Sequence, residues 1–475
     1  MITENDSQRR TASYTGFVVK IVLISTYELG RQPFGLASPA AWLRKRGHEV
    51  LCLDLSRQAL DEAALRAAEL IAFYLPMHTA TRLALQLIEP LRRLNSTAHF
   101  CAYGLYAPLS RKSFQESGIE SFFGGEFEEG LAQLADSLAK LEKPASRATN
   151  GHEKIVSLAR QTFEVPDRSG LAPLRQYAHL ILPTGEHRTV GYTEASRGCK
   201  HLCRHCPIVP VYNGVFRIVD SRVVLADIRQ QVAAGAQHIT FGDPDFFNGI
   251  GHAIPLLEGL HEEFPQLTYD VTIKIEHLKQ HEKYLTTLRD TGCLFVTSAV
   301  ESLDDEVLRK LEKGHTREDF IHVTEKCRDA GLTLQPTFLP FTPWTTLESF
   351  RDLLQVLDDL DLSNSVPPIQ LGIRLLIPEG SRLLELQDIR RKIGPFDESA
   401  LVYPWRHSDP RVDELCEEVQ RIVAASEKLK QGRAVTFERI WQTANAADGG
   451  QSLLSQLPHL ASRAAVPYLN EPWYC

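Results

Sequence analysis

Short apolar runs alternate with helix-like segments through the first third of the chain. The runs are rich in β-branched residues, as in KIVLIS at 20–25 and LIAFYL at 70–75. Continuous apolar runs of this length are typical of strands buried on both faces of a parallel sheet. We predict strands at 20–25, 49–55, 70–75, 99–103 and 121–123, and helices at 39–46, 63–67, 80–94 and 127–141. This alternation predicts a Rossmann-like open parallel sheet over residues 18–141, with helices on both faces.

The pattern breaks after residue 141 and resumes at residue 191. The intervening residues, 142–190, carry Pro144, Pro166, Pro173 and Pro183 between polar stretches. Prolines spaced in this way are typical of a connecting segment rather than of a helix or a central strand. We predict a linker that packs on the surface of both neighbours.

A second strand–helix series starts at residue 191. We predict strands at 192–195, 238–241, 269–275, 294–299, 332–338 and 369–376, with helices at 224–234, 254–263, 278–291, 304–312, 317–330 and 347–360. Six such units in about 190 residues predict a partial (β/α)6 TIM-like barrel over residues 191–400, with working loops at the carboxyl ends of its strands. Residues 401–475 are expected to be a helical and irregular C-terminal region. The fold class is therefore α/β.

The composition fits a globular protein of the cytoplasm. The chain has 475 residues, 43% of them hydrophobic, and a net charge of −8. No basic stripe is visible, which argues against a nucleic-acid partner. No apolar run reaches the roughly 18 residues that span a bilayer, so no membrane partner is expected. Residues 1–16 are polar and lack the apolar core of a signal peptide. The nine cysteines are odd in number and mostly scattered, unlike a disulfide framework.

Three cysteines form a compact motif after the first predicted barrel strand. Cys199, Cys203 and Cys206 have the spacing C-x3-C-x2-C, so three thiolates on one loop can converge on a cuboidal [4Fe-4S] cluster. Three ligands for four irons leave one iron open to another molecule. The alternative is a structural zinc site with His201 or His205 as fourth ligand, although no second C-x2-C pair accompanies the motif.

The segment Glu194-Ala-Ser-Arg-Gly-Cys-Lys-His-Leu-Cys-Arg-His-Cys-Pro207 closely resembles the cluster loop of the radical S-adenosylmethionine (SAM) superfamily. The resemblance covers about residues 190–390. It implies that SAM binds the open iron and is cleaved reductively, in most of the superfamily to a 5′-deoxyadenosyl radical. It also implies a protein reductant such as flavodoxin or ferredoxin. One departure is His205, because the position before the third cysteine is often aromatic in the family.

The same resemblance suggests which residues contact SAM. The turn Thr240-Phe-Gly-Asp-Pro-Asp-Phe246 occupies the place of the family's Gly-Gly-Glu-like turn. Gly242 would allow close backbone approach, and Asp243 or Asp245 could accept a hydrogen bond from the SAM ammonium. A common Gly-Asp-Pro turn is the alternative.

Further polar residues are predicted at the ends of later strands. Glu301 and Ser302 suit the ribose hydroxyls of SAM, although Ser302 could also cap the following helix. Arg374 could reach the SAM carboxylate or form a structural salt bridge. Strand alternation would place Lys274 and Glu276 on one face, inside the barrel or as an ion pair.

Residues 18–141 resemble the cobalamin-binding domain that precedes many radical SAM barrels. The Asp-x-His-x-x-Gly signature, whose histidine ligates cobalt in some of these domains, is missing. His78 follows the third strand and could face the carboxyl edge of the sheet. The loop Tyr27–Ser38 lies where a ligand would sit, or it could dock the barrel. The resemblance therefore makes cobalamin a possible cofactor of residues 18–141. The alternative is that this domain binds nothing, as some domains of this kind do.

The chain ends in Leu469-Asn-Glu-Pro-Trp-Tyr-Cys475. Overall it resembles the CUAEP/CCAEP-tail radical SAM (seleno)proteins, also through TYELGRQPFGLAS at 26–38 and AFYLPMHTAT at 72–81. Our hypothesis is that Cys475 is the first residue of that tail motif and that the next codon, UGA, encodes selenocysteine. A vicinal selenol and thiol could carry out redox work or bind a soft element such as arsenic or selenium. A simple exposed thiol is the alternative.

These features predict a radical SAM enzyme that acts on an unidentified small molecule or metalloid. Hydrogen abstraction, methyl transfer and transfer of the aminocarboxypropyl group of SAM all stay open as reactions. The rival classes are a non-catalytic iron–sulfur or zinc binding module, and a carrier that presents a soft element on Cys475.

Overall fold

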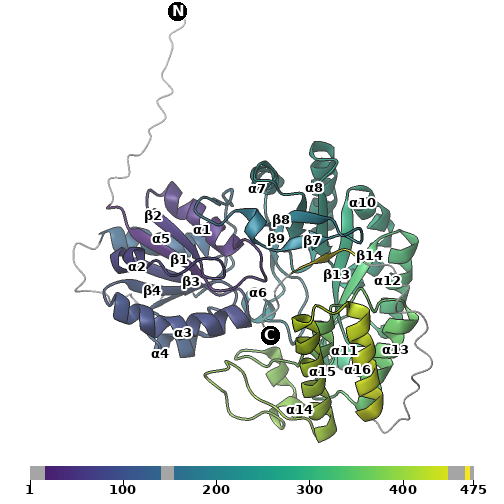
Figure 1. The fold of residues 1–475 in the computed structure, drawn as a ribbon. Coiled ribbons are helices and arrows are strands. Elements are labelled where there is room, and N and C mark those ends of the chain that lie inside the picture. Colours follow the sequence, from purple (N-terminus) through teal and green to yellow (C-terminus); the bar gives the residue numbers. More distant parts are fainter. Residues whose placement is uncertain (1–16, 141–154, 448–465, 471–475) are drawn as a thin grey trace, which may run out of the picture.

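Two parallel sheets lie side by side in the computed structural model, which describes residues 17–140, 155–447 and 466–470 (Figure 1). The first sheet, drawn in purple and blue, occupies the N-terminal part of the chain. The second, in teal and green, is flanked by the yellow-green C-terminal helices. No helix in the described ranges has both the length and the apolar character needed to cross a membrane.

The first sheet has six strands in the order β2-β1-β3-β4-β5-β6, each parallel to its neighbours. Its strands are β1 (Lys20–Ser25), β2 (Glu49–Asp54), β3 (Leu70–Tyr74), β4 (His99–Tyr103), β5 (Ser121–Gly125) and β6 (Val156–Ser157). Its helices are α1 (Phe34–Lys45), α2 (Glu62–Ala67), α3 (His78–Leu94), α4 (Arg111–Glu116) and α5 (Glu128–Lys140). Helices α1 and α5 bury one face, and α2, α3 and α4 bury the other. The predicted Rossmann-like layering is confirmed.

Helix α1 begins at Phe34, five residues before the predicted start at Pro39. A proline inside a helix cannot donate to the carbonyl four residues earlier, which here belongs to Gly35. The hydroxyl of Tyr103 donates to that carbonyl instead, at 2.8 Å. Gly35 also leaves room for the ring of Tyr74, because a Cβ at this position would lie 2.1 Å from it. Two tyrosines of the sheet therefore let the helix continue through its proline.

The segment between the sheets contacts both of them. Strand β6 extends the first sheet, and the amide of Asp167 donates to the carbonyl of Ala37 at 2.9 Å. The guanidinium of Arg168 donates to both carboxylate oxygens of Asp227, each at 2.8 Å, and to Gln32 at 2.7 Å. Arg168 thus links the two sheets directly. The predicted limits of the linker and of its neighbours remain predictions.

The second sheet has the order β14-β13-β12-β11-β8-β7-β15. Its parallel strands are β8 (His187–Thr193), β11 (His238–Phe241), β12 (Thr268–Thr272), β13 (Cys293–Glu301) and β14 (Thr333–Phe338). Two short antiparallel strands, β7 (His179–Ile181) and β15 (Tyr468–Leu469), extend one edge. The covering helices are α7 (Ser221–Ala233), α8 (Ile250–Glu263), α9 (Ile275–Gln280), α10 (Leu285–Asp290), α11 (Asp305–Leu311), α12 (Arg317–Asp329) and α13 (Leu347–Asp359). The sheet curls into a half-barrel, which bears out the predicted barrel-like α/β fold.

The predicted sixth barrel strand at 369–376 is wrong. Residues Pro368–Gly372 form a 3-10 helix, and one β-bridge between Phe341 and Arg374 is all that continues the sheet there. The consecutive prolines Pro367 and Pro368 lack the amide hydrogens that a strand needs to join a ladder. Helices α14 (Gln387–Arg390), α15 (Pro410–Lys428) and α16 (Arg433–Ala447) follow. Of these, α15 and α16 pack into the barrel's apolar core, so these two helices belong to this unit.

The third barrel strand also ends earlier than predicted. Strand β12 stops at Thr272, and Lys274 already lies at the N-terminus of helix α9. The alternation that would place Lys274 and Glu276 on one strand face therefore does not apply. Their side chains do form the predicted ion pair, at 3.3 Å.

Candidate cluster site and domain junction

The three motif cysteines lie on a loop at the carboxyl edge of the half-barrel. Strand β9 (Ser196–Gly198) leads into the loop and pairs with β10 (Phe216–Ile218), and helix α6 (Val209–Tyr212) lies between them. Cys199 and Cys203 are buried, Cys206 is partly buried, and all three are free thiols. Burial raises the pKa of Cys206 to about 12, and the nearby Cys203 and Cys199 act in the same direction. A metal centre at this loop would stabilise the thiolate forms by its positive charge.

Helix α11 anchors the middle of this loop. The amide of Arg204 donates to the carbonyl of Leu311 at 3.0 Å, and its side chain donates to the carbonyl of Lys310 at 2.9 Å. The same guanidinium pairs with Glu312 at 2.5 Å. Cations commonly pair with the free carbonyls at a helix C-terminus, so Arg204 fixes the loop between Cys203 and Cys206.

A buried ion network lies beside Cys203 and Cys206. The carboxylate of Glu301 is 3.0 Å from His205 Nε2 and 3.3 Å from Lys313 Nζ. Burial alone would raise the pKa of Glu301, but Lys313 and His205 outweigh it and bring the pKa to about 2. Glu301, predicted to contact ribose, therefore holds an imidazole and an ammonium in place beside the loop. The Lys313 ammonium in turn acts on both Cys203 and Cys206, where it can balance thiolate charge.

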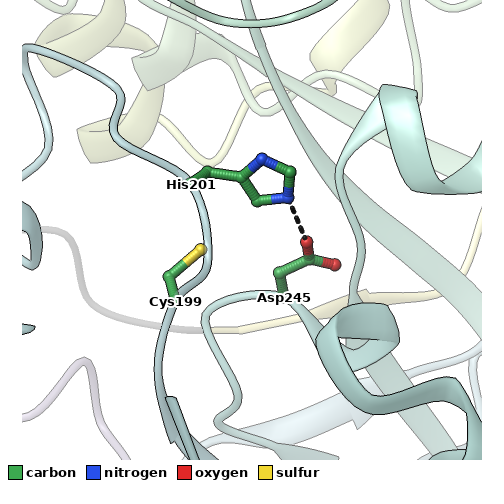
Figure 2. A group of neighbouring side chains, drawn as sticks. All are labelled: Cys199, His201 and Asp245. Atoms are coloured by element: carbon green, nitrogen blue, oxygen red, sulfur yellow. Dashed lines mark ion pairs between the residues drawn. The ribbon is translucent and has the colours of Figure 1, made fainter. Parts of the chain in front are cut away.

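A second polar group lies beside Cys199 (Figure 2). The ligand atoms of Cys199, His201 and Asp245 lie within 4.8 Å of one another, and His201 Nε2 is 3.3 Å from the Asp245 carboxylate. That carboxylate is fully buried and also lies 2.7 Å from His277 Nδ1. His201 and His277 outweigh the effect of burial and bring the pKa of Asp245 to about 2. The two histidines of the loop, His201 and His205, therefore both face carboxylates.

Asp243 and Gly242 shape the start of the cysteine loop. The Asp243 carboxylate accepts from the amide of Ala195 at 2.9 Å and from the hydroxyl of Ser196 at 2.5 Å. Burial raises its pKa to about 7. A Cβ at Gly242 would lie 1.8 Å from the hydroxyl of Tyr192, so only glycine fits there. Both residues lie next to the loop, where the SAM contacts were predicted, and Asp243 is bound to protein groups in this structure.

Ser302 and Arg374 are engaged by protein as well. The Ser302 hydroxyl accepts from the amide of Asp304 at 3.1 Å. The cap of α11 is Asp304, so the alternative that Ser302 caps this helix is wrong. Arg374 pairs with Asp413 at 2.7 Å and lies over the ring of Trp405. It is thereby held against the C-terminal region rather than beside the cysteines. The SAM-binding roles of these residues remain predictions.

The inner face of the half-barrel carries a polar set that the sequence reading did not single out. The Asp270 carboxylate accepts from the hydroxyl of Thr240 at 2.6 Å and lies 2.9 Å from His238 Nε2. A cavity of about 160 Å³ opens beside this set, lined also by Gln335 and by Arg433 of α16. Polar residues at every second position of a buried strand are the signal that could have revealed it.

A cluster of buried charges joins the two sheets, just before the cysteine loop. The Arg197 guanidinium pairs with Glu128 at 2.7 Å, with Glu194 at 2.8 Å and with Glu126 at 3.5 Å. Glu126 and Glu128 come from the carboxyl edge of the first sheet. Burial raises the pKa of Glu126 to about 7. One buried guanidinium, two residues from Cys199, therefore serves three carboxylates from both parts of the molecule.

The same junction provides little room for a corrin. The cavity between the sheets is about 230 Å³, below the roughly 300–1,000 Å³ of pockets for drug-sized ligands, and cobalamin is larger than a drug. Ile208 and Tyr212 line this cavity, and Tyr212 packs into the core of the first sheet. His78 lies at the start of α3 with Nε2 2.8 Å from the carbonyl of Ala400. We therefore derive no chemistry through cobalamin, whereas the three thiols fit an iron–sulfur cluster.

Comparison with known proteins found matches that include this site. Residues 193–357, which include all three cysteines, match the Radical SAM superfamily. The ribosomal protein uS12 methylthiotransferase RimO of Syntrophotalea carbinolica is 24% identical over 283 residues, which cover 55% of this chain and 60% of that protein. The hopanoid C-3 methylase of Methylococcus capsulatus is 21% identical over 325 residues, covering 66% and 62%. The chain thus spans about 60% of the length of these two curated relatives.

Two solved structures share the fold of both sheets. The methyltransferase TsrM from Kitasatospora setae, with cobalamin and a [4Fe-4S] cluster bound, superposes with a TM-score of 0.55 at 19% identity, over 72% of this chain and 74% of that one. The enzyme OxsB, with aqua-cobalamin and SAM bound, gives a TM-score of 0.64 at 14% identity, over 86% and 67%. The fold is thus shared with these structures, and residues 193–357, with the three cysteines, match the Radical SAM superfamily.

Proposed function

We propose that this protein is an enzyme that cleaves SAM reductively at a [4Fe-4S] cluster held by Cys199, Cys203 and Cys206. The observation that carries the proposal is the ligand count of the loop. Three free thiols lie close enough to affect one another, while His201 and His205 both face carboxylates. A loop that offers three thiolates, with its two histidines against carboxylates, would leave one iron of a cube for SAM.

Residues around the cysteine loop would help it to bind the cluster and SAM. The Lys313 ammonium favours the thiolate form of Cys206, because its charge acts to lower the pKa of that thiol. Arg204 holds the loop against α11, and the polar barrel interior offers hydroxyls and amides for a ligand with ribose and adenine groups. When bound, the cluster would supply the electron that breaks a carbon–sulfur bond of SAM. That electron would come from a small reductant such as flavodoxin or ferredoxin.

The substrate in this proposal is a small molecule or a metalloid compound. The curated relatives have names of methylases and methylthiotransferases, which makes group transfer from SAM the first reaction class to test. Hydrogen abstraction and aminocarboxypropyl transfer are the alternatives.

The nucleoside product distinguishes these reactions. The protein would be reconstituted with iron and sulfide without oxygen, reduced, and given SAM, and the products identified by mass spectrometry. 5′-Deoxyadenosine would support radical chemistry, S-adenosylhomocysteine methyl transfer, and 5′-methylthioadenosine aminocarboxypropyl transfer. No SAM-derived product from protein that retains its iron would contradict the proposal.

A metal-binding module is the second candidate, and the convergence of Cys199, His201 and Asp245 favours it. It predicts that the isolated protein retains one zinc ion, which His201→Ala removes while SAM is left uncleaved. The carrier alternative concerns Cys475, which lies outside the described residues. It predicts that Cys475→Ser abolishes binding of arsenite while loss of the cluster does not. The selenocysteine hypothesis depends on the codon after Cys475, where UAA or UAG would contradict it.

A further inference from the structure

The cavity inside the half-barrel combines polar groups from its strands with a charged group from a C-terminal helix. We call it the barrel cavity and define it by six of the residues that line it: Asp270, Thr272, Thr297, Gln335, Thr337 and Arg433. The first five lie on β12, β13 and β14, whereas Arg433 is the first residue of α16. The strands thus supply hydroxyl, amide and carboxylate groups, and the helix supplies a guanidinium.

Arg433 has no carboxylate partner among the described residues. Its guanidinium donates to the carbonyl of Asn364 at 2.9 Å and lies over the ring of Tyr468, with 4.6 Å between the guanidinium carbon and the ring centroid. These contacts hold the group in place, but they do not supply an opposite charge. Burial lowers the pKa of Arg433 to about 10, so the group is still charged at neutral pH. An anion beside it would offset the cost of burying this charge.

The other charged groups of the barrel cavity do not supply that anion. Asp270 is the one carboxylate among the described residues that line the cavity. Its Oδ1 atom accepts from the hydroxyl of Thr240 at 2.6 Å and lies 2.9 Å from His238 Nε2, and no ion pair joins it to Arg433. Arg31 lines the cavity as well and adds a second positive charge, with its guanidinium over the ring of Tyr192. The Arg433 guanidinium is therefore available to a ligand.

Three hydroxyls of the same cavity are also available. Those of Thr272, Thr297 and Thr337 form no hydrogen bond with a described residue, and Thr272 and Thr297 are register partners on neighbouring strands. A hydroxyl can donate to an oxygen of an anion, and a guanidinium can donate two parallel N–H groups to a carboxylate. Phe295 and Leu469 add apolar wall. The cavity thus offers charge, donors and apolar surface to a carboxylic acid.

The binding of SAM leaves this charge unused. Ribose and adenine groups carry no charge that would pair with Arg433. Under the proposed function the rest of SAM binds at the cysteine loop, and none of the three motif cysteines lines the barrel cavity. The ligand that pairs with Arg433 is therefore a second molecule.

We propose that the barrel cavity binds the carboxylate of a small organic acid, with Arg433 as its counter-ion and the threonine hydroxyls as further donors. A volume of about 160 Å³ admits a small acid or the acidic end of a larger molecule. That this acid is the substrate rests on the proposed function, whereas the binding of a carboxylate does not. Arg433 would then select acids over amines as substrates.

Three planar ligands of nearly equal shape and different charge test the proposal. Benzoate, benzamide and benzamidinium would be titrated into the full-length protein, with affinity measured by ligand-observed NMR. We expect benzoate to bind about tenfold more tightly than benzamide, and benzamidinium to bind most weakly, because hydrogen bonds between charged groups are stronger than those between neutral groups. Benzoate that binds no more tightly than benzamide to the wild-type protein would overturn the proposal.

The same substitution at two arginines of α16 localises the effect. Arg433→Met removes the charge and should lower the affinity for benzoate to that for benzamide. Arg439 lies on the same helix, donates to Ser426 and Gln431, and does not line the cavity, so Arg439→Met should retain the preference for benzoate. A preference that persists in Arg433→Met, or that both variants lose equally, would overturn the assignment of Arg433.

Thr297→Val provides an independent second variant, which decides the matter if Arg433→Met does not fold. It removes one hydroxyl from the cavity and should weaken benzoate binding several-fold while the melting temperature stays close to that of the wild type. Unchanged benzoate affinity in this variant would count against the proposal.

SAM cleavage is measured separately on reconstituted protein. A protein that prefers benzoate and leaves SAM intact would contradict only the proposed function. A protein that cleaves SAM and binds the three ligands equally would contradict only this inference.

Discussion

Both sheets are built from parallel strands joined by helices, yet the strands carry different residues. In β3 of the first sheet, five residues in a row, LIAFY, are buried. In β12 of the second sheet, Tyr269 and Val271 face the apolar core while Asp270 and Thr272 line a cavity. The first sheet has helices on both faces, so both of its faces must be apolar. The half-barrel curls around an inner face that is free of helices and can therefore hold polar side chains.

This difference shows where each sheet can support chemistry. The half-barrel has polar groups along the length of its inner face and the cysteine loop at its carboxyl edge. At the carboxyl edge of the first sheet, Glu126 and Glu128 reach Arg197. The cavity between the sheets is lined by residues of both edges.

Cys203→Ala should have the largest effect, because it removes one of three ligands from the proposed cluster. We expect cluster iron to be lost and SAM cleavage to fall by at least about a thousandfold, consistent with the loss of an essential cofactor ligand. Iron analysis after anaerobic reconstitution provides the measurement. Cys327→Ala, at a buried cysteine of α12, should retain full iron, and equal iron loss in both variants would contradict the assignment.

Arg197→Met tests the edge-to-edge contact of the two sheets. The substitution would leave Glu126, Glu128 and Glu194 buried around an uncharged side chain. We expect the free energy of unfolding in urea to fall by about 3–5 kcal/mol, as for other broken buried ion pairs. The exposed ion pair of Arg222 with Asp220 offers the control, because Arg222→Met should leave stability nearly unchanged. Similar losses in both variants would show that the cluster of charges does not hold the sheets together.

The same contact should make stability depend on pH. The pKa of Glu126 is raised to about 7 in the folded protein by burial, above the unfolded value of about 4.3. A raised folded pKa stabilises the protein fully below the unfolded pKa, and this contribution is lost as the pH rises through 7. Wild-type stability should therefore decline relative to Glu126→Gln between pH 5 and pH 8. Parallel pH profiles of the two proteins, measured by urea unfolding, would contradict this.

The smallest effects are expected when threonine and valine are exchanged in opposite directions in the two sheets. Thr297→Val on the inner face of the half-barrel should cost less than ~1 kcal/mol, because the side chain lines a cavity and loses no hydrogen bond to a described residue. Val22→Thr in β1, which is 2% exposed, buries a hydroxyl among apolar side chains and should cost about 1–3 kcal/mol. Urea unfolding of both variants provides the measurement. Equal costs would mean that the inner face is packed like the first sheet.

The sequence was most informative where a feature is local. Five of the six strands of the first sheet follow from apolar runs, whereas β6 lies in the predicted linker. The cluster site follows from three cysteines within eight positions. Features that depend on distant contacts were missed: helix α1 runs through Pro39 only because Tyr103 supplies the missing donor. In the same way, Arg197 forms ion pairs with glutamates about 70 positions away in the sequence. No periodic pattern in the sequence predicts such a pairing. The predicted sixth barrel strand was wrong because Pro367 and Pro368 lack the amide hydrogens of a ladder, and a 3-10 helix forms there instead.

Electron paramagnetic resonance of the reduced, reconstituted protein, with and without SAM, tests the central claim most directly. If Cys199, Cys203 and Cys206 hold a cluster with an open iron, the reduced protein should give an iron–sulfur signal that changes when SAM is added. Cys203→Ala should abolish both the signal and the change. A protein that retains zinc and gives no such signal, or a signal that SAM leaves unaltered, would contradict the account.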